Sequence, residues 1–200
     1  MLQLYALGIS PNLDIIHRVR VIKNELREHL QDWYSSQDSA AHLTLFLFYA
    51  TEENYGKIRA ELRRILAGIK PFELSFFGYD TFTKSGTFFI KPMTNSSLAI
   101  IAAGRYINMK LTIKTRRKYL FGWQTKYGRP HMSVARNLSP KSLSLATKKF
   151  RDFEESYLCD SFVIRKLNKS RGQYDIIDTI PLLGQGYIVG DQMLLFDHKK

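Results

Sequence analysis

His42-Leu43-Thr44-Leu45-Phe46-Leu47-Phe48 and His131-Met132-Ser133-Val134-Ala135-Arg136 are two short stretches of one pattern, and their histidines are 89 residues apart. Each stretch has a hydroxyl residue two positions after its histidine and is otherwise mostly apolar. Such short apolar runs are typical of buried strands rather than helices. Because residues two apart in a strand share a face, each stretch presents an imidazole and a hydroxyl on the same side.

The order of the surrounding elements repeats around the two stretches. A helix cap follows each histidine, at Thr51 and at Ser139, and another strand begins near Pro71 and Ser161, which are 29 and 30 residues after the histidines. Few residues are identical between the halves, so only the pattern repeats. We therefore expect an α+β fold with two similar lobes related by an approximate two-fold, each with an antiparallel sheet and flanking helices. We expect these lobes to form one bilobal domain over residues 1–200, since no Gly-, Pro- or Ser-rich linker separates them.

Hydrophobic spacing and turn residues predict the remaining elements. The expected strands are 2–8, 41–49, 71–79, 87–91, 130–137, 161–167 and 173–182, with one more strand after Gly190. The expected helices run from Ser10-Pro11 to about residue 33, from Thr51 to Gly68, from 95 to 108, and from Ser139-Pro140 to about Tyr157. Residues 112–129 are basic, aromatic and glycine-containing, and they predict a long loop or an irregular strand.

Two imidazoles and two hydroxyls suit chemistry at a phosphate ester. If a two-fold relates the lobes, the faces of the two strands meet across one cleft. One of His42 and His131 then removes a proton from the attacking group and the other protonates the leaving oxygen, since a free imidazole titrates near pH ~6.5. Thr44 and Ser133 can donate to the non-bridging oxygens, and this chemistry requires no metal and no other cofactor. A single histidine in a strand is more often structural, but two in matching strands favour the catalytic interpretation.

The positive charge of the chain lies in one region. The net charge is +12, and residues 110–171 contain 16 Lys and Arg against 4 Asp and Glu, so this region carries the whole excess. A polyanion such as RNA is the natural partner for such a field. From charge alone, a solvated basic face without a specific ligand is an equally good interpretation.

The bulk composition indicates a globular protein without a membrane segment. Hydrophobic residues make up 44% and charged residues 24% of the chain, and no run approaches the ~20 apolar residues of a membrane helix. The first residues lack the basic leader and cleavage site of a secretory signal. Cys159 is the single cysteine, and we expect it to be buried and reduced. These features predict a cytoplasmic protein, which we expect to be a monomer.

At the two histidine stretches the sequence resembles the two-histidine (2H) phosphoesterase superfamily, and within it the branch of 2′-5′ RNA ligase-like proteins and RNA cyclic phosphodiesterases. The signature of that family is a pair of strands with the pattern His-x-Thr/Ser-apolar, one in each lobe. The first stretch fits fully, and the second has Ser133 and Val134 where Thr and Leu are commoner. The resemblance spans about residues 1–183.

The resemblance implies a bilobal fold with a basic groove and an activity on RNA. That activity is hydrolysis of 2′,3′-cyclic phosphate ends to 2′-phosphates, or the related reversible 2′-5′ ligation, without ATP or metal. The resemblance implies that His42 and His131 are the catalytic pair and that Thr44 and Ser133 bind phosphate. For hydrolysis we assign His131 as the base toward water and His42 as the acid toward the leaving 3′ oxygen.

Arg136 is a further candidate for binding phosphate. Strict alternation along the strand places Arg136 on the opposite face from His131. It can reach the phosphate only if the strand ends or bends near Ala135. A surface arginine without a ligand is the alternative.

Two sets of aromatic residues allow both a binding and a structural interpretation. Phe46 and Phe48 share the parity of His42 and could stack on a base, but core packing is the commoner role. Aromatic and basic residues are interleaved between 116 and 129, which suits single-stranded RNA and equally suits a loop fixed to the core by its aromatics. We expect the other histidines, His17, His29 and His198, to be structural or exposed to solvent.

Three functions remain open from the sequence. The leading hypothesis is an enzyme that acts on RNA ends. The second keeps the chemistry and changes the substrate to a small nucleotide with a cyclic phosphate. The third is a non-catalytic RNA- or nucleotide-binding module of the same fold, against which the two complete pairs of histidine and hydroxyl argue.

Overall fold

The computed structural model describes residues 1–185, apart from the side chain of Lys114. Along the chain the helices and strands are β1 (Leu2–Ile9), α1 (Leu13–Leu30), β2 (Leu43–Thr51), α2 (Glu52–Ala67), β3 (Phe72–Phe82), β4 (Thr87–Pro92), α3 (Thr94–Lys110), α4 (Ile113–Tyr119), β5 (Phe121–Thr125), β6 (Met132–Ala135), α5 (Pro140–Lys149), β7 (Glu154–Cys159), β8 (Ser161–Asn168) and β9 (Gln173–Pro181). The strand expected after Gly190 lies outside the described residues.

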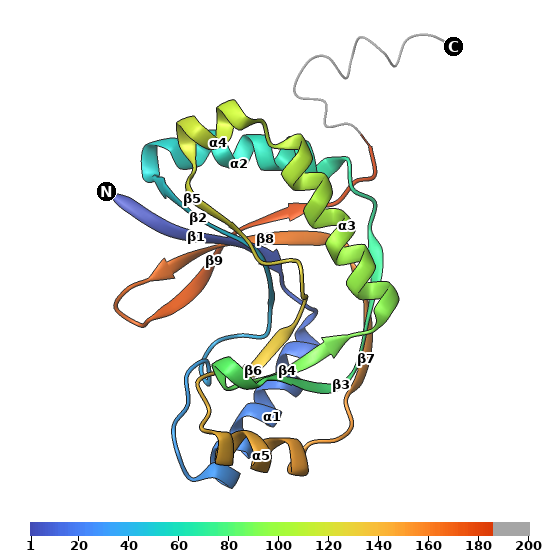
Figure 1. Cartoon of the computed structure of the whole chain (residues 1–200). Helices are drawn as coiled ribbons and strands as arrows, with labels where there is room; N and C mark the ends of the chain where they lie inside the picture. The colour runs from blue at the N-terminus through green and yellow to red at the C-terminus, as the bar shows by residue number, and fades with distance from the viewer. Residues whose placement is uncertain (186–200) are drawn as a thin grey trace.

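The strands form two antiparallel sheets, one in each lobe (Figure 1). The order is β5-β2-β1-β8-β9 in the first sheet and β6-β4-β3-β7 in the second. The predicted fold class, α+β with two lobes, is therefore confirmed. The lobes are not the two halves of the sequence, because β3 and β4 enter the second sheet and β8 and β9 return to the first. Each half of the chain thus contributes strands to both lobes.

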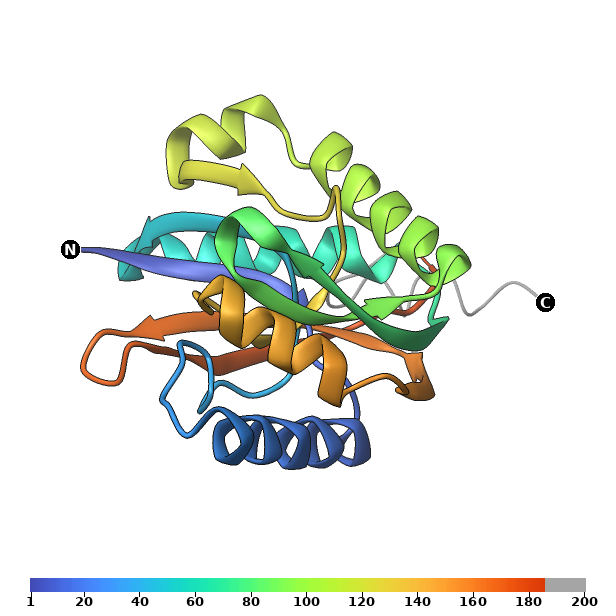
Figure 2. The same cartoon turned by 60° about the horizontal axis from the view of Figure 1, so that its bottom comes forward.

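Helices cover the outer face of each sheet (Figures 1 and 2). Helices α1 and α5 contact each other and pack on the four-stranded sheet, while α2 packs against β2 and β9 of the five-stranded sheet and also contacts α3 and α4. The core under these helices is rich in aromatic residues. Its fully buried phenylalanines include Phe46, Phe48, Phe76, Phe88 and Phe162.

Side-chain caps set the starts of α1, α2 and α5. Thr51 caps α2 and Ser139 caps α5, and each accepts a hydrogen bond from the backbone N–H three residues on, at 3.2 and 3.1 Å, as predicted. The predicted start of α1 is wrong, because Asn12 and not Ser10 is the cap and accepts from the N–H of Ile15 at 3.1 Å. Asparagine is as strong a cap as serine, so the sequence contained two competing starts.

Two other predictions of secondary structure need correction. Residues 112–129 were expected to form a long loop or an irregular strand, and the strand alternative holds for β5, which pairs with β2 across a shift in register at the edge of the sheet. The short helix α4, capped by Thr112, was not expected. Helix α5 ends at Lys149 and does not reach Tyr157, because the residues from 154 form β7, which pairs with β3. Pairing with a partner strand outweighs local propensity in both segments.

Candidate active site

One cavity between the two sheets collects all the candidate residues. Its volume is about 600 Å³, and its lining comes from β1 and β2 on one side and from β4 and β6 on the other. The α1–β2 loop and the β8–β9 hairpin complete its walls. We call this cavity the groove. The candidates that line it are His42, Thr44, His131, Ser133 and Arg136.

The two histidines make equivalent contacts with the backbone. Nδ1 of His42 lies 2.7 Å from the carbonyl oxygen of Ala40, and Nδ1 of His131 lies 2.9 Å from that of Arg129. A carbonyl oxygen only accepts hydrogen bonds, so Nδ1 is the donor in both rings. In the neutral form of each ring, Nε2 is therefore the unprotonated nitrogen and is available for proton transfer.

In β2 a bulge falls directly after Thr44. Thr44 and Phe46 pair with consecutive residues of β1, so Leu45 between them has no partner. The bulge shifts the alternation of side chains by one position. Thr44 therefore lines the groove, whereas Phe46 is fully buried. Phe48 is also fully buried, so the structural interpretation of both phenylalanines is confirmed.

The strand β6 has the same bulge after Ser133. Ser133 and Ala135 pair with consecutive residues of β4, so Val134 between them has no partner. The strand also ends at Ala135. These two features bring Arg136 to the side of Ser133, where its Nε donates to Ser133 Oγ at 3.2 Å. Arg136 thus lines the groove, in the position that strict alternation would not allow.

Positive charges surround His42. Burial lowers the pKa of His42 well below its usual value of 6.5, and the charges of Arg165, Arg136 and Lys23 lower it further. The hydrogen bond to the Ala40 carbonyl opposes this shift. An anion in the groove would offset the same charges and favour the imidazolium form.

Aromatic rings surround His131. The ring centroid of His131 lies 4.9 Å from that of Phe82 and 5.3 Å from that of Phe89. Burial lowers the pKa of His131, while its hydrogen bond to the Arg129 carbonyl raises it and the charge of Arg136 lowers it. Both histidines therefore favour the neutral form more than a free imidazole does.

Lys23 is a groove residue that the sequence analysis did not identify. It lines the groove with 1% of its surface exposed, and its Nζ donates to the carbonyls of Ser36 and Ser39 at 2.8 and 2.7 Å. Burial lowers the pKa of Lys23 to about 7. The sequence did contain a signal, because Lys23 falls between Val19 and Leu26 on the apolar face of α1.

Aromatic packing fixes much of the segment 116–129. The ring of Trp123 stacks on Phe46 with 4.4 Å between centroids, and its Nε1 donates to Asn108 Oδ1 at 3.2 Å. The ring of Tyr127 lies 5.2 Å from that of Phe46. For these two aromatics the structure supports the interpretation as a segment fixed to the core.

The remaining candidate groups lie away from this chemistry. Cys159 is 1% exposed, as predicted, and burial raises the pKa of its thiol to about 12. His17 and His29 are exposed on α1, and His198 lies outside the described residues. Within residues 1–185 no group of three His, Cys, Asp or Glu side chains could hold a metal ion. No helix in the same range is long and apolar enough to cross a membrane.

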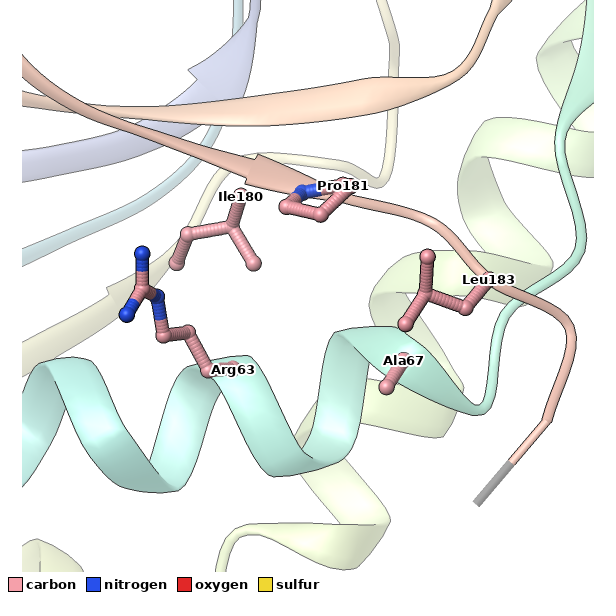
Figure 3. Close-up of a pocket in the computed structure, with 5 residues that line it drawn as sticks. All are labelled: Arg63, Ala67, Ile180, Pro181 and Leu183. Atoms are coloured by element: carbon pink, nitrogen blue, oxygen red, sulfur yellow. The ribbon is translucent and has the colours of Figure 1, made fainter. Parts of the chain in front are cut away.

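A smaller pocket of about 220 Å³ lies between α2 and β9 (Figure 3). Of the described residues, it is lined by a single charged side chain and by none of the candidate residues. Its lining residues are Arg63, Ala67, Ile180, Pro181 and Leu183. These groups cannot exchange a proton near neutral pH, so the groove is the candidate active site.

Comparison with known proteins yields one family model and several solved structures. The model of the 2'-5' RNA ligase superfamily matches residues 12–171. E. coli LigT complexed with 3'-AMP has a TM-score of 0.64 and 17% identity, covering 90% of this chain and 98% of that chain. The protein TT0787 of Thermus thermophilus has a TM-score of 0.62 and 16% identity, covering 91% of this chain and 99% of that chain. A search of curated protein sequences gives no match. At these identities the solved structures show a shared fold.

Proposed function

The chain belongs to the 2'-5' RNA ligase superfamily, and we propose that it hydrolyses 2′,3′-cyclic phosphate ends of RNA, or carries out the related reversible 2′-5′ ligation. The observation that carries this proposal is the meeting of His42 and His131 in one groove, with Nδ1 of each bonded to a backbone carbonyl. E. coli LigT, which has a similar fold, is described in complexes with 3'-AMP and with phosphate. Both ligands contain phosphate, which is the group that we propose the groove of this chain binds.

The proposed reaction moves two protons between the substrate and the histidines. In hydrolysis, Nε2 of His131 accepts a proton from water as the water oxygen attacks phosphorus. The bond from phosphorus to the 3′ oxygen breaks, and that oxygen takes a proton from His42. The products are a 2′-phosphate and a 3′-hydroxyl. In ligation a 5′-hydroxyl takes the place of water and the histidines keep these roles. In the reverse reaction, cleavage of a 2′-5′ linkage, the two histidines exchange roles.

The protonated state of His42 is needed at the start of hydrolysis. The positive charges around His42 oppose this state, as the direction of its pKa shift indicates. A phosphodiester brings a negative charge that offsets them and favours the imidazolium form. We therefore propose that substrate binding itself prepares the acid.

Three further side chains are proposed to bind the phosphate. Thr44 and Ser133 offer hydroxyl donors from opposite sheets, and Arg136 offers its guanidinium next to Ser133. Charge that develops on the non-bridging oxygens is stabilised by such fixed donors. None of these steps uses a metal ion or ATP.

The direct test is turnover of an oligonucleotide with a 2′,3′-cyclic phosphate end, in the presence of EDTA. Phosphorus NMR should show conversion of the cyclic phosphate to a 2′-phosphate. Formation of a 3′-phosphate instead would contradict the proposed leaving group. Binding of the oligonucleotide without any product would favour a non-catalytic module, and a complete loss of turnover in EDTA would contradict the metal-independent mechanism.

RNA is the preferred substrate class in this proposal because of the charge of the chain. The region 110–171 carries the whole net charge of +12, and Lys126 and Arg171 line the groove. Turnover of an oligonucleotide should weaken steeply with salt, whereas turnover of a mononucleotide cyclic phosphate should respond little. A preference for the mononucleotide at all salt concentrations would instead support a small cyclic nucleotide as substrate.

A further inference from the structure

Arg165 of β8 is a buried arginine with an incomplete set of hydrogen bonds. Only 3% of its surface is exposed. Its Nη2 donates to the carbonyl of Tyr174 at 2.9 Å, but Nε and Nη1 have no partner within the part of the chain that the structure describes. A buried guanidinium with unpaired donors is costly, since both its charge and its N–H groups lose their hydration. Such a group is expected to have a partner in the working protein.

Strand register places Arg165 on the groove side of the five-stranded sheet. Arg165 pairs with Ala6 of β1, and Ala6 pairs with Leu47 of β2. Ala6 and Leu47 both line the groove, and directly paired residues of neighbouring strands point to the same face. Tyr174, whose carbonyl holds Nη2, lines the groove as well. Arg165 therefore lies on the groove side of the sheet, next to lining residues of the groove but not itself part of the lining.

The charges around the groove are almost all positive. Its lining includes Lys23, Lys126, Arg136 and Arg171, and among residues 1–185 Asp38 is the single acidic residue in that lining. Arg165 adds a further positive charge from β8, and among all charged groups it has the largest effect on His42. An anion is therefore the ligand that would balance this set of charges.

We propose that Arg165 is a second phosphate-binding arginine, whose Nε–H and Nη1–H donate to oxygens of the substrate phosphate from the groove side of the five-stranded sheet. This inference rests on the proposed function for the identity of the ligand. Arg136 then holds the phosphate from the β6 side and Arg165 from the β8 side, with the two histidines between the sheets. The sequence pattern alone marks Arg165 only as one residue of a strand.

The test is the affinity for inorganic phosphate, measured by calorimetry on the wild-type protein and on Arg165→Gln. Loss of two charge-assisted hydrogen bonds should weaken binding by about 10–100-fold. Arg165→Lys keeps the charge and loses the planar fork, so its affinity should fall between the other two. Equal affinity in all three proteins would overturn the inference.

The matched control is Lys166→Gln. Lys166 is the next residue of the same strand, so it points to the opposite face, and it pairs with Glu52 Oε1 at 2.6 Å. This variant removes the same charge without touching the groove, and phosphate affinity should change by less than about 3-fold. An equal loss in Lys166→Gln and Arg165→Gln would show an effect of net charge and would overturn direct binding.

Two further measurements separate a structural role of Arg165 from a role in binding phosphate. Circular dichroism shows whether Arg165→Gln folds. If it does not fold, the Nε–H resonance of Arg165, assigned by its loss in Arg165→Lys, is followed as phosphate is added to wild type. A saturable shift supports the inference, and no shift at a phosphate concentration that saturates the groove overturns it.

The inference and the proposed function fail in different ways. An unchanged KM for a cyclic-phosphate oligonucleotide in Arg165→Gln would overturn the inference and leave the proposed function intact. Absence of turnover in a wild-type protein that binds phosphate through Arg165 would contradict the proposed function and leave the anion site intact.

Discussion

The strands β2 and β6 contain the same motif in different surroundings. β2 has nine residues and pairs on both sides, with β1 and β5. β6 has four residues, and within the described part of the chain it pairs with β4 alone and is followed by one isolated bridge between Ser35 and Arg136. Both strands nevertheless have a bulge directly after the hydroxyl residue, and each is preceded by a histidine whose ring contacts the carbonyl two positions before it. The local geometry of the motif is therefore independent of whether its strand is central or at the edge.

The electrostatic surroundings of the two histidines differ. Besides burial, Arg165, Arg136 and Lys23 lower the pKa of His42. His131 lies against the rings of Phe82 and Phe89, and the cations that lower its pKa are Arg136 and Arg129. Two copies of one motif thus provide the same donor and acceptor atoms with different charge environments. An acid and a base must hold different protonation states at the same pH, and the cations around His42 oppose its proposed role as the acid until an anion binds.

The largest expected effect is the loss of activity on removal of either imidazole, which tests whether the two copies of the motif are both needed. His42→Ala and His131→Ala should each lower kcat on a cyclic-phosphate oligonucleotide by about 10²–10⁴-fold, because each removes one proton-transfer group. The kcat of the double variant should be only slightly below that of the less active single variant, since the two groups act in one reaction. His17→Ala, on the exposed face of α1, is the control and should retain full activity. Undiminished turnover in either groove variant would contradict the mechanism.

The hydroxyls should show a smaller effect and a difference between the strands. Thr44→Val and Ser133→Ala should each lower kcat/KM by about 10–100-fold, because each removes a donor to a charged phosphate. Ser133 also accepts from Arg136, so Ser133→Ala and Arg136→Ala should be non-additive in a double-mutant cycle. Thr44→Val and Arg136→Ala should be additive. Additivity in both cycles would show that the contact between Ser133 and Arg136 has no role.

The bulge in β2 can be tested through stability. A Cβ on Gly8 would lie 2.3 Å from the carbonyl oxygen of Leu43, so Gly8→Ala should lower the free energy of unfolding by ~1–3 kcal/mol in urea denaturation. Gly56, within α2, has nothing within 4 Å of such a Cβ. Gly56→Ala should therefore raise the free energy of unfolding by ~0.5–1 kcal/mol. Stabilisation by Gly8→Ala would contradict the close approach of β1 and β2 at the motif.

Proton NMR titration of the histidine rings sharpens the electrostatic comparison. In the protein alone, both His42 and His131 should titrate below 6.5, because burial lowers both pKa values. Phosphate should raise the pKa of His42 more than that of His131, since it offsets the cations around His42. An equal response of the two rings would contradict the assigned asymmetry.

The same lowered pKa values determine how stability depends on pH. The unfolded chain binds protons at its histidines at a higher pH than the folded chain does. The contribution of these two neutral rings to stability is therefore complete above 6.5 and is lost as pH falls through their folded pKa values. Phosphate should reduce this loss, which thermal unfolding at several pH values measures.

Local signals in the sequence predicted most elements. The caps Thr51 and Ser139, the stop at Gly68 and the apolar alternation of the strands depend on neighbours along the chain, so they are visible in it. The burial of Cys159 was also predicted correctly, from the residue type. Segments whose structure depends on a distant partner were predicted less well. The segment of β7 was predicted as helix but becomes a strand by pairing with β3, and the sequence left open whether the segment of β5, which pairs with β2, is a loop or a strand.

The chain by itself determined the chemical groups of the candidate site, namely two histidines and two hydroxyls at a spacing that puts each pair on one face of a strand. Only the tertiary structure decided what surrounds them. The unpaired residues after Thr44 and Ser133 arise where two strands meet in shifted register, and they turn Arg136 toward the groove and Phe46 away from it. Arg165 lies on the groove side of the sheet for the same reason, because hydrogen bonding between strands far apart in sequence sets which side chains share a face.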